Sequence, residues 1–306
     1  MIAALPFYEM RMVEGGVRVI LGDFATVVPT GPIPVDPWAT LVCLGVLLGL
    51  ELARARGIKM GLDVRDVVDG IVFIVLFGFL IAHVFTVVAY FPERLSRDGV
   101  MSLLRVWEGF SSTGGFLGGI AGMWLFYGVI RPRPGLVLRF ADLFAYGFPL
   151  GWFFGRLGCA VVHDHIGQPT DFALGVAFPV GHYAAGVRHE LGLYEMLLTV
   201  PMIALYAWLG RKDQPPGTFL GIFFIFYAPV RFGLDALRSV DLSSSDARYL
   251  GLTPAQYGMI AAFLFGVALV AYARRRPFAP WALDGQPDQA ARAAAGEPSP
   301  EAAAGG

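Results

Sequence analysis

Long apolar runs constrain the fold of this chain more than any other feature. An α-helix needs about 20 predominantly apolar residues to cross a bilayer. Seven runs of suitable length and character occur, at Trp38–Ala53, Val67–Phe91, Thr113–Ile130, Asp142–Val161, Leu191–Leu209, Gly217–Leu237 and Ala255–Ala273. The chain is 56% hydrophobic and 15% charged, with a mean hydropathy of +0.61, a balance rare in soluble domains. The sequence therefore predicts an all-α polytopic membrane protein with about seven transmembrane helices and an outer loop region.

The basic residues between these runs predict the orientation. They concentrate after the first, third, fifth and seventh runs, as Arg54, Arg56, Lys59, Arg65, Arg131, Arg133, Arg139, Arg211, Lys212, Arg274, Arg275 and Arg276. The opposite loops carry fewer arginines, mixed with acidic residues. Because cytoplasmic loops are enriched in lysine and arginine, we expect the N-terminus outside and the C-terminus in the cytoplasm.

The chain divides into three parts by composition. Residues 1–37 are expected to form an outside, interfacial segment, since Met1–Val28 mixes charges among apolar residues and lacks the pattern of a secretory signal. Residues 38–276 form the predicted membrane domain. Residues 277–306 are dominated by Ala, Gly and Pro, a composition that predicts a disordered cytoplasmic tail.

Charge and cysteine content exclude several classes of function. The formal net charge is −1 and no basic stripe exists apart from the inside loops, so no nucleic-acid partner is expected. The two cysteines, Cys43 and Cys159, fall in different predicted spans and suggest neither a disulfide framework nor a zinc site. His163 and His165 flank Asp164, but this set offers no credible third ligand of known geometry, and no metal site is predicted.

Charged residues inside the apolar runs are candidates for a functional site. Arg156 lies within an apolar run, where an arginine costs about 2.5 to 3.5 kcal/mol and generally needs an anionic partner or a water-filled cavity. Tyr227, Arg231, Asp235 and Arg238 are spaced by four, four and three residues, which places them on one helical face. The predicted orientation puts both sets in the outer half of the membrane.

Two interpretations of these charges are open. In the structural one, Arg231 and Asp235 neutralise each other while Arg156 and Arg238 extend to the outer headgroups. In the functional one, three arginines against one nearby aspartate leave positive charge for an anionic ligand. A guanidinium matches phosphate oxygens in a bidentate manner, so a phospholipid phosphate from the outer leaflet is the natural candidate.

Several motifs together resemble one family. The first comprises Gly155, Arg156, Gly158, Cys159, Asp164 and Gly167. Further segments are Arg188-His189 with Leu193-Tyr194-Glu195, Trp107-Glu108-Gly109 with Gly114–Gly118, and Tyr227, Arg231, Asp235 and Arg238. Over roughly residues 31–273 the chain resembles the prolipoprotein diacylglyceryl transferases of the bacterial inner membrane.

The resemblance implies a reaction. A diacylglyceryl group would pass from phosphatidylglycerol to the lipobox cysteine thiol of a preprolipoprotein, releasing glycerol 1-phosphate without any cofactor. Arg156 and Arg231 would hold the lipid phosphate and stabilise the leaving group, Asp164 and Asp235 would orient the arginines or the loop, and Tyr227 would donate a hydrogen bond to the headgroup. The implied substrate-binding positions also include Arg238, Gly167, His189, Glu195, Thr113 and Trp38.

One departure from the family pattern concerns the residue that would take the proton from the acceptor thiol. Thr113 stands where the family has the histidine of its His-Gly-Gly motif, and His83 stands where it has arginine. A thiol has an ordinary pKa near 8.5, so a nearby base should help at neutral pH, and threonine is not one. The substitute is His163, His165 or His189, or the arginines alone lower the pKa of the thiol.

Three hypotheses for function follow. The chain is an active transferase with an altered base, a diverged relative that binds anionic phospholipid or a lipoprotein precursor without turnover, or a lipid transporter using the same arginine cavity. Retention of Arg156 and Arg231, which are costly to keep in a membrane, favours the first. The lack of a corresponding pair of interrupted helices in two halves disfavours the third.

Overall fold

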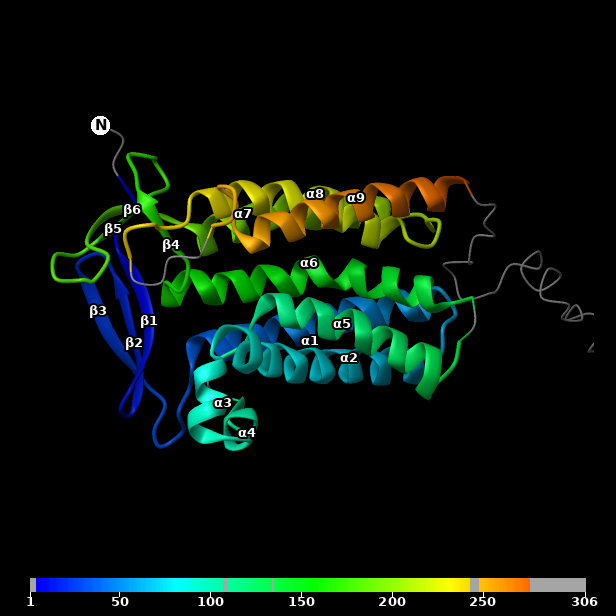
Figure 1. Ribbon diagram of the computed structural model, residues 1–306, viewed down its shortest axis with the longest axis horizontal. Coiled ribbons are helices and arrows are strands. Elements are labelled where there is room, and N and C mark those ends of the chain that lie inside the picture. The colour runs from blue at the N-terminus through cyan, green and yellow to red at the C-terminus, as the bar shows by residue number, and fades with distance from the viewer. Residues whose placement is uncertain (1–3, 107–108, 134, 243–247, 276–306) are drawn as a thin grey trace, which may run out of the picture. The chain divides into compact units, whose positions relative to one another are not determined.

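Helices make up most of the computed structural model, which describes residues 4–106, 109–133, 135–242 and 248–275 (Figure 1). The α-helices are α1 (Pro37–Lys59), α2 (Val64–Phe85), α3 (Pro92–Asp98), α4 (Met101–Leu104), α5 (Ser112–Leu125), α6 (Val137–Val162), α7 (Leu191–Leu209), α8 (Thr218–Ala236) and α9 (Pro254–Arg275). Two π-helical turns, η1 (Thr86–Tyr90) and η3 (Phe126–Ile130), continue α2 and α5. The tail predicted at residues 277–306 lies outside the described residues.

Each of the seven predicted apolar runs coincides with one of these helices. Five are long and apolar enough to cross a membrane: α1, α2 extended to Ala89, α7, α8 and α9. A shorter apolar helix covers Gly114–Ile130, and α6 is 26 residues long but is not among the five. The prediction of a helical, multi-pass membrane protein is confirmed at this level.

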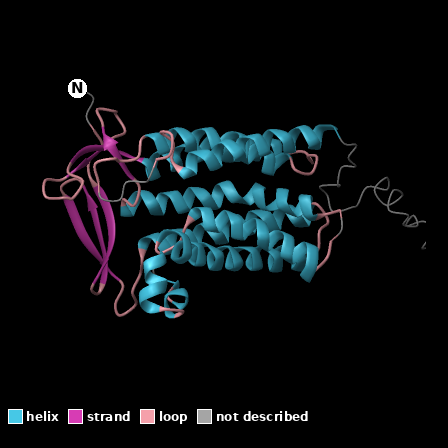
Figure 2. Cartoon of the chain, viewed as in Figure 1, coloured by secondary structure: helices cyan, strands magenta, loops and turns pink. Residues whose placement is uncertain are grey.

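Two small antiparallel sheets were missing from the all-α prediction (Figure 2). The first has the order β1-β2-β3 and the second the order β4-β6-β5. The strands are β1 (Tyr8–Val13), β2 (Gly16–Leu21), β3 (Phe24–Pro29), β4 (Ile166–Pro169), β5 (Val176–Phe178) and β6 (Gly186–Glu190). Strands of three to six residues are short beside the apolar runs, so their alternation is a weak signal.

The chain forms two compact units. Among the described residues, the first unit comprises residues 4–51, 145–212 and 218–275, and the second comprises residues 52–144 and 213–217. Both sheets and helices α7 to α9 belong to the first unit, whereas α2 to α5 belong to the second. Helices α1 and α6 contribute one part to each unit.

The second sheet of the first unit is built on a small apolar core. Ile166, Val176 and Phe178 are buried together, and the N-terminal segment packs against them. Leu5 extends this contact, since its N–H donates to the carbonyl oxygen of Gly175 over 2.8 Å. β6 ends directly where α7 begins, so the sheet fixes the start of that helix.

Glycines allow the helices of the first unit to approach closely. A Cβ atom added to Gly45 of α1 would lie 2.5 Å from the carbonyl oxygen of Gly151 of α6. On α9, a Cβ added to Gly266 would lie 2.7 Å from the carbonyl oxygen of Gly221 of α8. Small residues at such crossings are how membrane helices gain van der Waals contact. The crossings hold α6 and α8, which carry the polar residues, against α1 and α9.

In the second unit, α2 and α5 meet through glycines of α5. A Cβ on Gly114 would lie 2.6 Å from the Cβ of Phe85, and one on Gly118 would lie 2.9 Å from the Cα of Gly78. By contrast, Gly119 has nothing within 4 Å of such a Cβ. Of the glycines Gly114, Gly115, Gly118 and Gly119 of α5, Gly114 and Gly118 make the close approach, whereas Gly115 and Gly119 do not.

The Gly118→Ala substitution should therefore destabilise the packing of α2 against α5. Its methyl group meets backbone, which cannot rotate away, so we expect a loss of about 1 to 3 kcal/mol in unfolding free energy. The matched control is Gly119→Ala, which should be neutral or slightly stabilising because alanine favours helix. Thermal unfolding in detergent measures both, and equal melting temperatures would contradict the packing described.

Candidate active site

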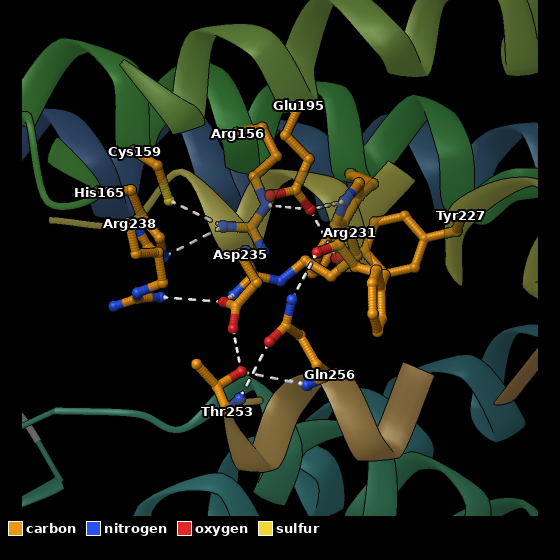
Figure 3. Close-up of polar contacts among 12 residues, drawn as sticks. Arg156, Cys159, His165, Glu195, Tyr227, Arg231, Asp235, Arg238, Thr253 and Gln256 are labelled. Carbon is orange, nitrogen blue, oxygen red and sulfur yellow. Dashed lines mark hydrogen bonds and ion pairs between the residues drawn. The ribbon is translucent and has the colours of Figure 1, made fainter. Parts of the chain in front are cut away.

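A buried ion pair joins α6 to α7 in the first unit (Figure 3). Arg156 Nε lies 3.1 Å from Glu195 Oε1, and the two residues are 5% and 2% exposed. The same carboxylate oxygen accepts the hydroxyl of Tyr227 over 2.5 Å and the indole N–H of Trp152 over 3.2 Å. The guanidinium also lies over the Trp152 ring, 4.4 Å from its centroid. Three helices thus hold Arg156 in one orientation.

The Arg156 guanidinium retains donor capacity on its far side. Nη1 lies 3.8 Å from Cys159 Sγ and 3.5 Å from His165 Nε2, contacts that are long for hydrogen bonds. Arginine carries five N–H donors in a fixed fork. An anion with several oxygen atoms matches such a fork better than these two neighbours do.

A second charge cluster lies along the end of α8. Arg231 Nη2 is 3.2 Å and Arg238 Nη1 is 3.8 Å from the same oxygen of Asp235, Oδ1. The spacing of four and three residues produces this arrangement, as the sequence pattern predicts. Thr253 donates its hydroxyl to the other oxygen of Asp235. Asp235 is completely buried and is therefore held between α8 and the start of α9.

Thr253 and Gln256 support this cluster and were missed by sequence reasoning. The Thr253 N–H donates to Gln256 Oε1 over 3.0 Å, and the Gln256 N–H donates to Thr253 Oγ1 over 3.2 Å. This reciprocal pair is the capping box that a Thr-x-x-Gln sequence signals at a helix start. The signal was present, but only the fold reveals that the capping threonine also bonds Asp235.

Three buried polar atoms of the arginine cluster have no hydrogen-bond partner among the described residues. They are Nη1 of Arg231, Oε2 of Glu195 and Oδ1 of Asp235. Leaving a buried donor unsatisfied costs about 1 to 3 kcal/mol, and more for a charged group. The Arg231 nitrogen is therefore a donor prepared for an acceptor that the described residues do not supply.

The charge balance differs from the one read from the sequence. Three arginines were set against one aspartate, but Glu195 is a second carboxylate inside the cluster. Asp164 is a third carboxylate, and it interacts electrostatically with Arg156 at longer range. The formal charges of the arginines and carboxylates thus nearly cancel. The case for an anionic ligand therefore rests on the direction in which the available guanidinium donors point, and not on an excess of positive charge.

The loop after α6 contains two histidines in different surroundings. His163 is buried; its Nδ1 lies 2.8 Å from Glu190 Oε2, and its Nε2 donates to the carbonyl oxygen of Tyr8. Burial raises the pKa of the Glu190 carboxyl to about 7, and the bond with His163 opposes that rise. His163 thus ties the N-terminal segment to the loop, a structural role.

His165 instead faces the arginine cluster. Its Nδ1 contacts Asp164 Oδ1, and its Nε2 faces Arg156. Burial raises the pKa of Asp164, but hydrogen bonds with His165 and Cys159, together with the charge of Arg156, outweigh this and hold that pKa below its ordinary value. The carboxylate is therefore ionised at neutral pH and accepts the imidazole N–H.

The remaining predicted positions fall in three places. Gly167 forms a backbone bridge with Arg238, and a Cβ on Gly167 would lie 2.7 Å from the carbonyl oxygen of Leu237, so glycine permits this approach. His189 Nδ1 lies 3.0 Å from the hydroxyl of Tyr194 rather than in the arginine cluster. Trp38 lies on α1, next to Gly158 of α6.

Two positions of the family pattern lie in the second unit. Thr113 lies in the first turn of α5, where the structure describes the backbone but not this side chain. His83 is fully buried, with its ring nitrogens each 3.1 Å from a carbonyl oxygen, those of Gly109 and Ser102. His83 therefore anchors the segment between α2 and α5.

One group of residues resembles a metal site in composition. Cys159, Asp164 and His165 place possible ligand atoms within 4.8 Å of one another. The guanidinium of Arg156 contacts the sulfur and the imidazole. A permanent positive charge against two of three ligands disfavours a cation and favours an anion at this place.

Comparison with known proteins identifies the chain's relatives. The family model described as "Prolipoprotein diacylglyceryl transferase" matches residues 25–272. A phosphatidylglycerol--prolipoprotein diacylglyceryl transferase of Erythrobacter litoralis is 34% identical over 208 residues, covering 66% of this chain and 70% of the relative. Enzymes of the same name from Cupriavidus necator and Solidesulfovibrio magneticus are 30% and 29% identical, covering 80% and 82% of this chain and 91% and 94% of the relatives.

Removing Glu195 should destabilise the protein strongly. Glu195→Ala leaves Arg156 buried without its carboxylate, and breaking one side of a buried pair costs about 3 to 5 kcal/mol. Glu195→Gln keeps an acceptor for Tyr227 and Trp152 and should cost less. The control is Glu93→Ala, at an exposed position of α3, which should stay within about 0.5 kcal/mol. Denaturant unfolding in detergent tests the order, and an Ala variant as stable as the control would refute it.

Proposed function

Because the chain belongs to the prolipoprotein diacylglyceryl transferase family, we propose that it transfers a diacylglyceryl group from phosphatidylglycerol to the lipobox cysteine of a prolipoprotein. The relatives named above carry both substrates in their names. In this reaction the thiol sulfur forms a bond to the terminal glyceryl carbon of the lipid. The bond from that carbon to the phosphate oxygen breaks, and glycerol 1-phosphate leaves.

One observation carries the proposal for the site: Nη1 of the buried Arg231 has no hydrogen-bond partner among the described residues. Together with the far side of Arg156, it offers donors to a phosphate. Fixed positive charge in a water-poor pocket is most effective where negative charge develops during the reaction. The leaving phosphate gains charge as the carbon–oxygen bond breaks, so these donors stabilise the transition state more than the bound lipid.

The other residues of the cluster position these two arginines. Asp235 holds Arg231 and Arg238, and Glu195 holds Arg156. In this proposal Tyr227, whose hydroxyl bonds Glu195, donates its hydroxyl to the lipid headgroup when lipid is bound. Such positioning matters because a small displacement of a catalytic group costs much of its effect.

The remaining proposed substrate contacts are carried over from the family pattern. Gly167 and His189 border the loop that receives the peptide, and Trp38 lines the side formed by α1. Thr113 is included because it stands where the family has the histidine of its His-Gly-Gly motif.

The proposed setting is the bacterial inner membrane. Residues 38–276 cross it seven times, with residues 1–37 outside and residues 277–306 in the cytoplasm, because the basic links alternate with the apolar runs. In this orientation Arg156, Arg231 and Asp235 all lie in the outer half. An outer-leaflet lipid and an exported prolipoprotein reach the site from the same side.

Arg231→Ala should abolish transfer. Loss of one preorganised donor costs about 100-fold to 1,000-fold in rate. Arg231→Lys keeps the charge without the planar fork and should fall between. Purified protein, phosphatidylglycerol and a lipobox peptide are incubated, and release of glycerol phosphate is followed.

The matched control for that assay is Arg11→Ala, whose side chain is 68% exposed on β1. This variant should keep the wild-type rate. Wild-type protein that binds lipid without releasing glycerol phosphate would instead identify a diverged binding protein. Full activity of Arg231→Ala would refute the assigned phosphate contact.

A further inference from the structure

The acceptor thiol needs a proton acceptor, and the geometry around His165 supplies one. A thiol is mostly protonated at neutral pH, and a positioned base accelerates such a step by about 100-fold to 10,000-fold. Resting on the proposed transferase function, we propose that the imidazole of His165 takes the proton from the acceptor thiol and that Asp164 positions the imidazole.

The contacts of His165 define its tautomer. Arg156 is only a donor, so the Nε2 atom that faces its Nη1 at 3.5 Å carries the lone pair. The N–H is then on Nδ1, where the ionised carboxylate of Asp164 accepts it. A neutral imidazole with its lone pair toward the reacting groups and its N–H on a carboxylate is the arrangement of a general base.

The other four histidines of the chain lack this arrangement. Both ring nitrogens of His83 and of His163 are already in contact with protein groups. Nδ1 of His182 accepts the N–H of Ala184 in an outer loop, and Nδ1 of His189 meets the hydroxyl of Tyr194. His165 is the histidine with a ring nitrogen against the arginine cluster.

The side chain of His165 is also accessible to solvent, unlike that of the nearby His163. Its side chain is 23% exposed, whereas that of His163 is 2% exposed. The charged and titratable groups around it are Asp164 beside it, Arg156 and Cys159 on α6, Glu195 on α7, and Arg238, whose backbone pairs with β4. A thiol arriving at Nε2 therefore enters a site already lined by the phosphate-binding groups.

The contact between His165 and Arg156 also links proton removal by His165 to binding of the lipid phosphate. When a phosphate takes the Nη donors of Arg156, Nε2 of His165 loses a weak partner and becomes available to the thiol. The phosphate's negative charge also lies close to the imidazolium that forms and stabilises it. Proton removal is thus favoured once lipid is bound.

One proton and two electron pairs move in the chemical step. The thiol proton moves to Nε2 of His165, and the sulfur electron pair forms the bond to the glyceryl carbon. The electron pair of the broken carbon–oxygen bond leaves with glycerol 1-phosphate, whose added charge meets Arg156 and Arg231. The imidazolium then returns its proton to the phosphate product or to water.

His165→Gln tests the proposal, because the amide keeps an acceptor near Arg156 but is not a base. With a cysteine lipobox peptide, glycerol phosphate release should fall by about 100-fold or more. With a selenocysteine lipobox peptide, whose selenol is already ionised at neutral pH, the same variant should stay within about 10-fold of wild type. Equal losses with both peptides would show a merely structural role and overturn the proposal.

Two further variants keep the outcome interpretable. Asp164→Asn should lower the rate with cysteine by about 10-fold or more and affect selenocysteine less, as a positioning residue would. His182→Asn, which retains an acceptor for the Ala184 N–H, should be indistinguishable from wild type with both peptides. An active wild type with an unaffected His165→Gln refutes this inference alone, whereas an inactive wild type refutes the transferase function and this inference with it.

Discussion

The ion pair between Arg156 and Glu195 is the interaction that organises the site. Both side chains are almost completely buried, and the carboxylate gathers donors from α6 and α8 while it belongs to α7. Taking two charges out of water is costly, so such a pair contributes less to stability than to specifying one arrangement of helices. In this protein that arrangement leaves Nη1 of Arg156 facing His165, while Nε faces Glu195.

A second constraint is the set of contacts that Asp235 makes at the end of α8. Asp235 Oδ1 forms ion pairs with Arg231 and Arg238, yet Nη1 of Arg231 has no hydrogen-bond acceptor among the described residues. The capping box of α9 fixes Asp235 from the other side, so the carboxylate cannot turn to satisfy that nitrogen. A buried donor maintained in this way is a cost to folding, and in the proposed function the lipid phosphate offsets it.

Local periodicity predicts much of this arrangement, and long-range contacts determine the rest. Apolar runs mark each long helix, and the spacing of four and three residues places Arg231, Asp235 and Arg238 on one helical face. The partner of Arg156 could not be predicted, because Glu195 is far away in the sequence and no local pattern relates the two. The short strands were missed for a different reason: a few alternating residues carry too little signal. Which histidine faces Arg156 is likewise a matter of loop geometry.

Recognition of a lipid by the arginine cluster through its phosphate can be tested by native mass spectrometry. Purified protein is released from micelles that contain phosphatidylglycerol and diacylglycerol with identical acyl chains in equal amounts. We expect phosphatidylglycerol to stay bound to the wild type while diacylglycerol does not, and Arg156→Lys to lose this preference. Equal retention of the two lipids by the wild type would show that the phosphate is not what the cluster recognises.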